Sequence, residues 1–238
     1  MRQKLNLFNS VICLCLDKRK EYWKELQKQT EDLGIEFMPF IVGKGLDSNL
    51  KYDLIDELNP DVSNWGYGSE GLKQNHYWAL KSHQKMAAKA QELGFDRVMF
   101  MEDDAYWTSR AITIIKNIEE RKDSLDYLLS FPVIYAGWWG FGEENSEYNL
   151  QIENSFNKNG EISLREIKYG TNIGGAHGVV FTKEMFPIIQ SLPTLTTLDT
   201  QLCLMRNEIP AIKICPKIIH VRTCWSYCEG AVFNRKVL

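Results

Sequence analysis

The feature that most constrains the fold is a short apolar run that ends in three consecutive acids. Residues 97–101 read RVMFM, and Glu102, Asp103 and Asp104 follow directly. An unbroken run of this kind is typical of a buried strand, and buried strands of α/β sheets carry their ligands at their carboxyl ends. Three adjacent carboxylates stay ionised together only if a divalent metal ion or a set of Lys and Arg side chains neutralises them. The alternative is that Asp103 or Asp104 only ends the strand in a turn.

The spacing of apolar residues in the rest of the chain predicts alternating strands and helices. Besides the central run, the predicted strands are 10–16, 35–42, 126–133, 179–182, 209–215 and 217–221. The predicted helices are 18–33, 47–58, 72–93, a segment from Thr108 or Ser109 to about 121, 183–192 and 198–207. Because the chain starts as strand, helix, strand, the sequence predicts an α/β fold with a parallel sheet and a nucleotide-type crevice. The 238 residues contain no repeat or linker, so we expect one domain.

Composition excludes several classes of partner. The net charge of −3 argues against a broad basic surface for nucleic acid. No run approaches the ~18 apolar residues of a membrane span, and the first 16 residues are interrupted by polar ones without a cleavage site, so we expect no transmembrane segment and no signal peptide. Six cysteines without the density of a disulfide scaffold favour a reducing compartment. We therefore expect a cytoplasmic protein, with attachment to the periphery of a membrane left open.

In their order along the chain, several segments resemble glycosyltransferase family 25, the lipooligosaccharide β-galactosyltransferase group, over about Val11 to Ser226. The matching pieces are Leu14-Cys15-Leu16-Asp17-Lys18-Arg19 at the first strand exit, the helical pair Ser82-His83, the triplet Glu102-Asp103-Asp104, the Gly-rich lead from Gly175 to Thr182, and Leu198-Asp199. The resemblance implies a single-domain GT-A-type (Rossmann-like) fold with a mixed, mostly parallel sheet flanked by helices. It implies a nucleotide-sugar-binding part at about 10–105 and an acceptor-binding part at about 106–238.

The resemblance also implies an activity, the metal-dependent transfer of a hexose from a UDP-sugar to an acceptor hydroxyl with inversion. Mn2+ or Mg2+ would neutralise the diphosphate as it leaves. Asp104 is the expected direct metal ligand, and Glu102 and Asp103 are expected to support it through water or the ribose. His220, near the end of the last strand, is a candidate second ligand; the alternative is a surface or core histidine.

The same resemblance suggests which residues contact the donor. Leu16, Asp17 and Arg19 would lie beside the nucleotide base and ribose, unless they only form the solvated start of a helix. His83 points inward from its helix, where it either faces the donor or is a satisfied core residue. Displacement at the anomeric carbon with inversion needs a base for the acceptor hydroxyl. Asp199 is the candidate, and the alternative is that it caps its helix.

Residues 136–148 are rich in Gly and aromatic residues and are predicted to form a mobile loop. Trp138 and Trp139 could stack on an acceptor sugar, as lid loops commonly order on binding, or pack against the sheet. The acceptor would be a glycan, a glycolipid or a glycoprotein.

Two other functions remain open: a catalytically silent sugar- or nucleotide-binding module on the same fold, and a metal-dependent nucleotidyltransferase. The latter would need a Gly-rich phosphate loop after the first strand, and residues 17–20 contain no Gly.

Overall fold

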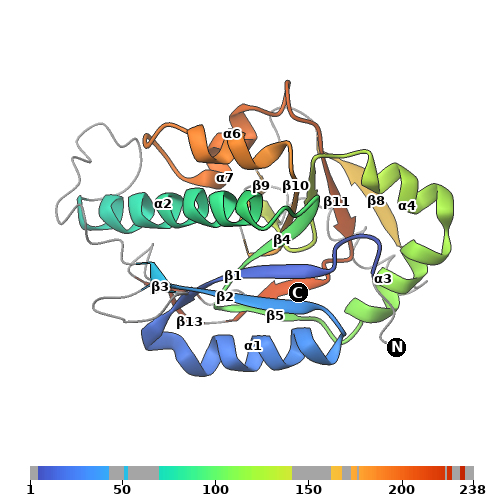
Figure 1. Cartoon of the computed structure of the whole chain (residues 1–238), viewed down its shortest axis with the longest axis horizontal. Helices are drawn as coiled ribbons and strands as arrows, with labels where there is room; N and C mark the ends of the chain where they lie inside the picture. Colours follow the sequence, from blue (N-terminus) through green and yellow to red (C-terminus); the bar gives the residue numbers. More distant parts are fainter. Residues whose placement is uncertain are drawn as a thin grey trace.

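A mixed eight-stranded sheet forms the centre of the computed structural model, which describes residues 5–42, 51–52, 70–140, 162–167, 173–175, 177–222, 224–226 and 231–233 (Figure 1). Its strands, in spatial order, are β3 (Lys51–Tyr52), β2 (Glu36–Val42), β1 (Ser10–Leu16), β4 (Arg97–Glu102), β10 (Val179–Thr182), β6 (Val133–Tyr135), β11 (Ala211–Cys215) and β8 (Ser163–Glu166). Only β10 and β8 run antiparallel to their neighbours. The predicted α/β class, a mixed and mostly parallel sheet flanked by helices, is confirmed.

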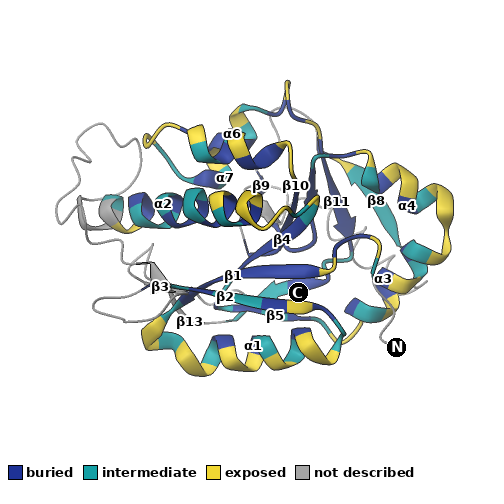
Figure 2. Ribbon diagram, viewed as in Figure 1, coloured by how far each residue is buried: buried dark blue, intermediate teal, exposed yellow. Residues whose placement is uncertain are grey.

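Helices cover both faces of this sheet (Figure 1). One face carries α2 (Glu70–Glu92), α6 (Met185–Ser191) and α7 (Leu198–Leu204), and the other carries α1 (Lys20–Asp32), α3 (Ala111–Glu120) and α4 (Lys122–Leu129). A short 3-10 turn, η1 (Asp17–Arg19), connects β1 to α1. The side chains of the central strands are buried and the outward faces of the helices are exposed (Figure 2). Each face therefore has its own apolar core, with the sheet between them.

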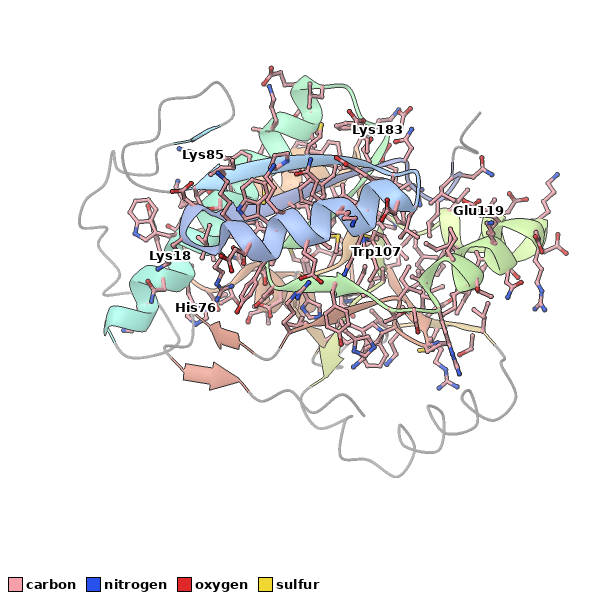
Figure 3. All side chains as sticks on the ribbon, turned by 90° about the horizontal axis from the view of Figure 1, so that it is seen from below. Lys18, His76, Lys85, Trp107, Glu119 and Lys183 are labelled. Carbon is pink, nitrogen blue, oxygen red and sulfur yellow. The ribbon has the colours of Figure 1, made fainter. Side chains whose placement is uncertain are left out.

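Three two-stranded sheets surround the main one, made by β5 (Ala105–Trp107) with β12 (Ile219–Val221), β7 (Trp139–Gly140) with β9 (Ile173–Gly174), and β13 (Cys224–Ser226) with β14 (Ala231–Phe233). The β5 strand lies beside α1, where the Trp107 indole N–H donates to Thr30 Oγ1 at 2.8 Å (Figure 3). On the other side β12 passes close to the main sheet: a Cβ on Gly137 or Gly178 would lie 2.8 or 2.9 Å from Ile219. Only glycine permits this approach.

The strand directions bring several carboxyl ends to one edge of the sheet. β1 and β4 are parallel, and β6 is antiparallel to β10, which is itself antiparallel to β4. β11 is parallel to β6. The carboxyl ends of β1, β4, β6 and β11 therefore lie at the same edge, which is where ligands bind in sheets of this type.

Four local predictions were wrong. The segment 126–133 is not a strand, because α4 extends to Leu129 and β6 begins only at Val133; Leu125 and Leu128, three apart, bury one helical face. Lys51–Tyr52 forms a strand where a helix over 47–58 was predicted, and the rest of that range lies outside the described residues. Ala136 and Trp138 are buried rather than part of an exposed loop. Helical spacing predicts that Leu93 lies on one stripe with Leu80 and Met86 of the helix 72–93, but Leu93 is exposed whereas the other two are buried.

Pro39, inside the strand predicted over 35–42, indicates an edge position or an irregularity. β2 is second from the edge of the sheet, because the short strand β3 lies outside it. Pro39 lies in β2 opposite Cys13 of β1, while β3 pairs only with Ile41 and Val42. On the side away from β1, no described strand pairs with Pro39, so the N–H that proline lacks is not needed for a hydrogen bond of the sheet there.

The pair Asn159-Gly160 between two extended pieces predicts a hairpin over 149–167. Of this range the structure describes only 162–167, which contain β8. In the described part of the chain, no helix has the length and apolar character needed to cross a membrane.

Candidate functional site

One buried carboxylate joins the ends of β1 and β4. Asp103 is only 3% exposed. Its Oδ2 accepts the backbone N–H of Leu16 at 2.8 Å, and its Oδ1 accepts Nη1 of Arg19 at 2.8 Å. Because Leu16 ends β1 and Arg19 ends the turn after it, these two bonds fix the strand exit against the acidic triplet. The sequence-predicted residues Leu16, Arg19 and Asp103 are thus brought together.

Arg19 supplies positive charge to two members of the triplet. Its Nη1 lies 2.8 Å from Asp103 and 3.7 Å from Asp104 Oδ2. Burial nevertheless raises the pKa of Asp103 to about 6, because desolvation outweighs the attraction of Arg19, and the charge of Asp104 adds to the rise. Of the two neutralising agents expected from the sequence, the structure shows an arginine. Asp17, in the same turn, is exposed.

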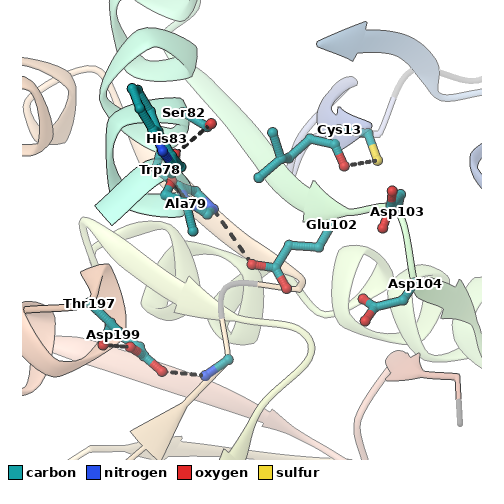
Figure 4. Close-up of polar contacts among 12 residues, drawn as sticks. Cys13, Trp78, Ala79, Ser82, His83, Glu102, Asp103, Asp104, Thr197 and Asp199 are labelled. Atoms are coloured by element: carbon teal, nitrogen blue, oxygen red, sulfur yellow. Dashed lines mark hydrogen bonds and ion pairs between the residues drawn. The ribbon is translucent and has the colours of Figure 1, made fainter. Parts of the chain in front are cut away.

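Glu102 points away from its two neighbours and toward His83 on α2 (Figure 4). Nδ1 of His83 lies 2.8 Å from the carbonyl oxygen of Ala79 and must donate to it, since a carbonyl only accepts. Burial lowers the pKa of His83, so the ring is neutral and Nε2 is its acceptor. Nε2 lies 4.0 Å from Glu102 Oε1 and has no hydrogen-bond partner among the described residues. Two acceptors that face each other this way suit a ligand with two donor hydrogens, such as a pair of neighbouring hydroxyls.

Asp199 organises the start of α7. Its carboxylate accepts the hydroxyl of Thr197, the backbone N–H of Thr200 at 2.9 Å and the backbone N–H of Gly175 at 3.1 Å (Figure 4). Thr197 is the N-cap of α7, and Gly175 has a φ of 92°. Asp199 therefore binds donors at the start of its helix, as the structural alternative for this residue predicts, although the N-cap itself is Thr197. The carboxylate of Asp199 also lies close enough to His83 to act on the charge of that ring. The assignment of Asp199 as the catalytic base stays a prediction.

His220 lies on β12, directly opposite Tyr106 of β5, and the two rings stack with centroids 5.9 Å apart. Burial and the charge of Lys217 lower the pKa of His220 to about 4, so its imidazole is neutral. Beyond it, the N–H of Arg222 donates to the carbonyl oxygen of Asp104 at 2.8 Å. Arg222, which binds the backbone of Asp104, is two residues after His220. The pairing of β5 with β12 thus brings the backbone of His220 toward that of Asp104.

The carboxylate of Asp104 and the neutral imidazole of His220 are both of a type that can bind Mn2+ as a ligand. Within the described segments, however, no group of three or more His, Cys, Asp and Glu side chains is close enough to hold a metal ion. Glu102, Asp104 and His220 are therefore not gathered into a metal centre by the side chains described. The metal assignment stays a prediction.

The two tryptophans predicted to contact an acceptor differ in what the structure describes. Trp138 is 5% exposed, and its indole N–H donates to the carbonyl oxygen of Ile214 in β11 at 3.3 Å. Lys213 Nζ and Lys217 Nζ lie 4.0 and 4.5 Å from the centre of its ring. Trp138 therefore packs on the sheet. Trp139 belongs to β7, and its side chain lies outside the described residues. An acceptor role for either stays a prediction.

The sequence reasoning missed a polar group beneath α7. Tyr135, the last residue of β6, is fully buried, and its hydroxyl accepts Nη2 of Arg206 at 3.0 Å. Burial raises the pKa of Tyr135 to about 12. Lys213, which interrupts the apolar strand AIKIC beside β6, is a visible signal of a polar neighbourhood, because a charged residue inside a buried strand usually has a partner, but it does not identify Arg206 or Tyr135.

Comparisons with known proteins do not establish a family. No protein-family model matches the sequence, and no curated protein matches it. One similar solved structure is a glycosyltransferase involved in the glycosylation of the major capsid of PBCV-1, with 11% identity and a TM-score of 0.35; the match covers 84% of this chain and 66% of that one, just under two thirds. Another is CMP:2-keto-3-deoxy-manno-octonic acid synthetase complexed with CTP, with 7% identity, a TM-score of 0.39, and coverage of 86% and 88%. Both TM-scores are below 0.5.

Proposed function

We propose that this protein is a glycosyltransferase that moves a hexose from a nucleotide-sugar donor, a UDP-sugar, to an acceptor hydroxyl with inversion. The observation that carries the proposal is the bond network of Asp103. It joins the exits of β1 and β4 and leaves Arg19, Asp104 and Glu102 at the carboxyl edge of the sheet. Ligands of α/β sheets bind at this edge, and the resemblance to glycosyltransferase family 25 concerns the same residues.

In the proposed site, side chains of this protein match each part of the donor and the hydroxyl of the acceptor. The base and ribose contact the turn after β1, and the cationic Arg19 favours the diphosphate. Glu102 and the neutral Nε2 of His83 accept hydrogen bonds from two neighbouring sugar hydroxyls. Mn2+ or Mg2+, held by Asp104 and His220, would supply charge neutralisation for the leaving nucleotide. Asp199 takes the proton of the acceptor hydroxyl.

The test compares Asp104→Asn with the wild type. We expect UDP and Mn2+ together to raise the Tm of the wild type, because a ligand that binds only the folded state stabilises it. Asp104→Asn should abolish this shift and reduce transfer at least about 100-fold, the scale seen when one charge-stabilising group is lost. A matched control is Asp96→Asn. Asp96 lies just before β4, at the opposite edge, and pairs only with Lys183 in the described residues, so its removal should change neither value.

Other outcomes identify the competing functions. Binding of UDP without hydrolysis or transfer of the donor sugar would indicate a silent binding module. Release of pyrophosphate from a nucleoside triphosphate in the presence of a sugar phosphate would indicate a nucleotidyltransferase. Full activity of Asp104→Asn would contradict the assignment of Asp104 within the proposed site.

A further inference from the structure

Arg206 is a buried cation whose donors are incompletely used. It follows α7, is 5% exposed, and holds its guanidinium carbon 5.5 Å from the centre of the Tyr135 ring. Nη2 donates to the Tyr135 hydroxyl, whereas Nε and Nη1 are buried and have no hydrogen-bond partner in the described part of the chain. A neutral phenol is therefore its only described hydrogen-bond acceptor.

This arrangement disfavours the unliganded folded state. Arg206 therefore places a guanidinium in the protein interior with few of its donors bonded to described residues. A buried charge is tolerated when an anion and hydrogen bonds compensate for its lost hydration. Neither the hydroxyl of Tyr135 nor its ring carries a negative charge, since burial raises the pKa of that hydroxyl to about 12.

Further positive charge gathers around the same point. Lys213, 7% exposed, is registered opposite Tyr135 in the parallel pair of β6 and β11, so both side chains lie on the same face. Lys213 and Lys217 both lie over the ring of Trp138. Three cations and two aromatic rings thus surround the carboxyl ends of β6 and β11, at the sheet edge that also carries the acidic triplet.

We propose that Arg206 forms an anion-binding site that receives a phosphate or carboxylate group of the acceptor. This inference rests on the proposed function for the identity of the ligand as an acceptor. The anion would be bound by residues of the expected acceptor-binding part, which begins at about residue 106, and not by Arg19. Guanidinium groups bind both kinds of anion through directed N–H donors, and Nε and Nη1 are the donors available.

The experiment measures the Tm of the wild type and of Arg206→Met against increasing inorganic phosphate and, separately, glucuronate. Sodium chloride keeps the ionic strength constant, because phosphate also stabilises proteins unspecifically. For the wild type we expect a saturable rise on the order of 3–6 °C at ten times the dissociation constant. Arg206→Met should lose that saturable rise. Without anion its Tm should be equal to or above that of the wild type, because the substitution removes a buried charge that has no ion pair among the described residues.

Arg97→Met is the matched control. Arg97 lies at the start of β4, at the opposite edge of the sheet, and also has a buried Nη1 without a hydrogen-bond partner among the described residues, while its Nη2 donates to the carbonyl oxygen of Leu129. The anion response should survive this substitution. A response to phosphate alone would identify a phosphorylated acceptor, and a response to glucuronate alone an acidic sugar.

Two results would overturn the proposal: no saturable response of the wild type to either anion, or an equal response in Arg206→Met. If Arg206→Met does not fold, Arg206→Lys replaces it, and a response equal to that of the wild type would likewise overturn the role of the guanidinium. The shift with UDP, measured on the same proteins, separates this inference from the proposed function. Loss of the anion response with an intact UDP shift supports the anion site, whereas an Arg206-dependent anion response without any UDP shift contradicts only the donor assignment.

Discussion

Asp103 is a buried carboxylate whose two oxygens both accept donors from the exit of β1. These bonds favour its charged form, but the loss of hydration is larger, so its pKa is raised to about 6. The protonated form is therefore the one that the folded state favours relative to the unfolded chain. At the residue scale, Asp103 holds the site together and at the same time makes stability depend on pH.

We predict that Asp103→Asn changes this pH dependence. A raised pKa contributes stability that is present in full below the usual value near 3.8 and is lost as the pH rises through about 6. Between pH 4 and 7 the wild type should lose up to about 3 kcal/mol from this group, since one pKa unit corresponds to about 1.4 kcal/mol. The asparagine variant has no such loss, so its stability relative to the wild type should rise with pH. Urea denaturation at several pH values measures the difference.

Asp96→Asn serves as a control of opposite sign. The hydrogen bond from Lys183 lowers the pKa of Asp96, so this carboxylate adds stability above its usual pKa and loses it in acid. Its asparagine variant should therefore lose stability relative to the wild type as the pH rises. Parallel pH profiles of Asp103→Asn and the wild type would contradict the burial argument for Asp103.

At the scale of elements, Asp199 connects the start of α7 to the Gly-rich segment before β10. We predict that Asp199→Asn lowers turnover far more than donor affinity, as expected for a base. It should also lower the Tm by about 2–4 °C, because an amide cannot accept all the N–H donors that the carboxylate holds and a lost cap costs about 1 kcal/mol. Steady-state kinetics with donor titration and a thermal melt measure these effects.

Thr197→Val separates the two roles of this helix start. Thr197 Oγ1 lies 3.4 Å from the N–H of Thr200 and also donates to Asp199. Its removal should reduce the Tm to a similar degree while the carboxylate and most of the turnover remain. If both variants lose turnover and donor affinity in equal proportion, Asp199 acts only as a structural residue.

Elements with a long, consistent pattern could be predicted from the sequence. β1 and α2 carry uninterrupted strand and helix periodicities, and both were found close to their expected bounds. The end of α4 was missed because Tyr127, Leu128 and Leu129 have high apolar content that fits a strand equally well, and only the burial of Leu125 and Leu128 on one side distinguishes a helix. Short segments carry too few residues to decide between the two periods.

The candidate site could be predicted where a residue follows directly from a strand end, as Asp103 and Arg19 do. The tautomer and facing partner of His83 could not be predicted, because they depend on how α2 packs against β4. Arg206 could not be found either: its contact with Tyr135 joins residues 71 positions apart, and no local pattern reports such a contact.

At the scale of the whole molecule, β10 connects the two parts that the sequence assigned to donor and acceptor. It lies between β4, from the donor part, and β6, from the acceptor part, and pairs with both. Phe181 of β10 is fully buried and packs its ring against Phe100 of β4 with centroids 5.2 Å apart. Neither part can therefore keep a complete sheet without the other, and the single domain stays a prediction that an unfolding experiment can test.

We predict that Phe181→Ala destabilises both parts equally. Truncation of a buried Phe costs about 3–5 kcal/mol, and in a single cooperative unit that loss appears in every amide that exchanges through global unfolding. Hydrogen exchange should show the same loss of protection in β1 and β2 as in β6 and β11, and urea unfolding should follow one transition by circular dichroism and by Trp fluorescence. Leu204→Ala, at a side chain that is 67% exposed, should change neither value. Two separate transitions, or a loss of protection confined to the strands after residue 106, would show that the donor and acceptor parts fold as independent units.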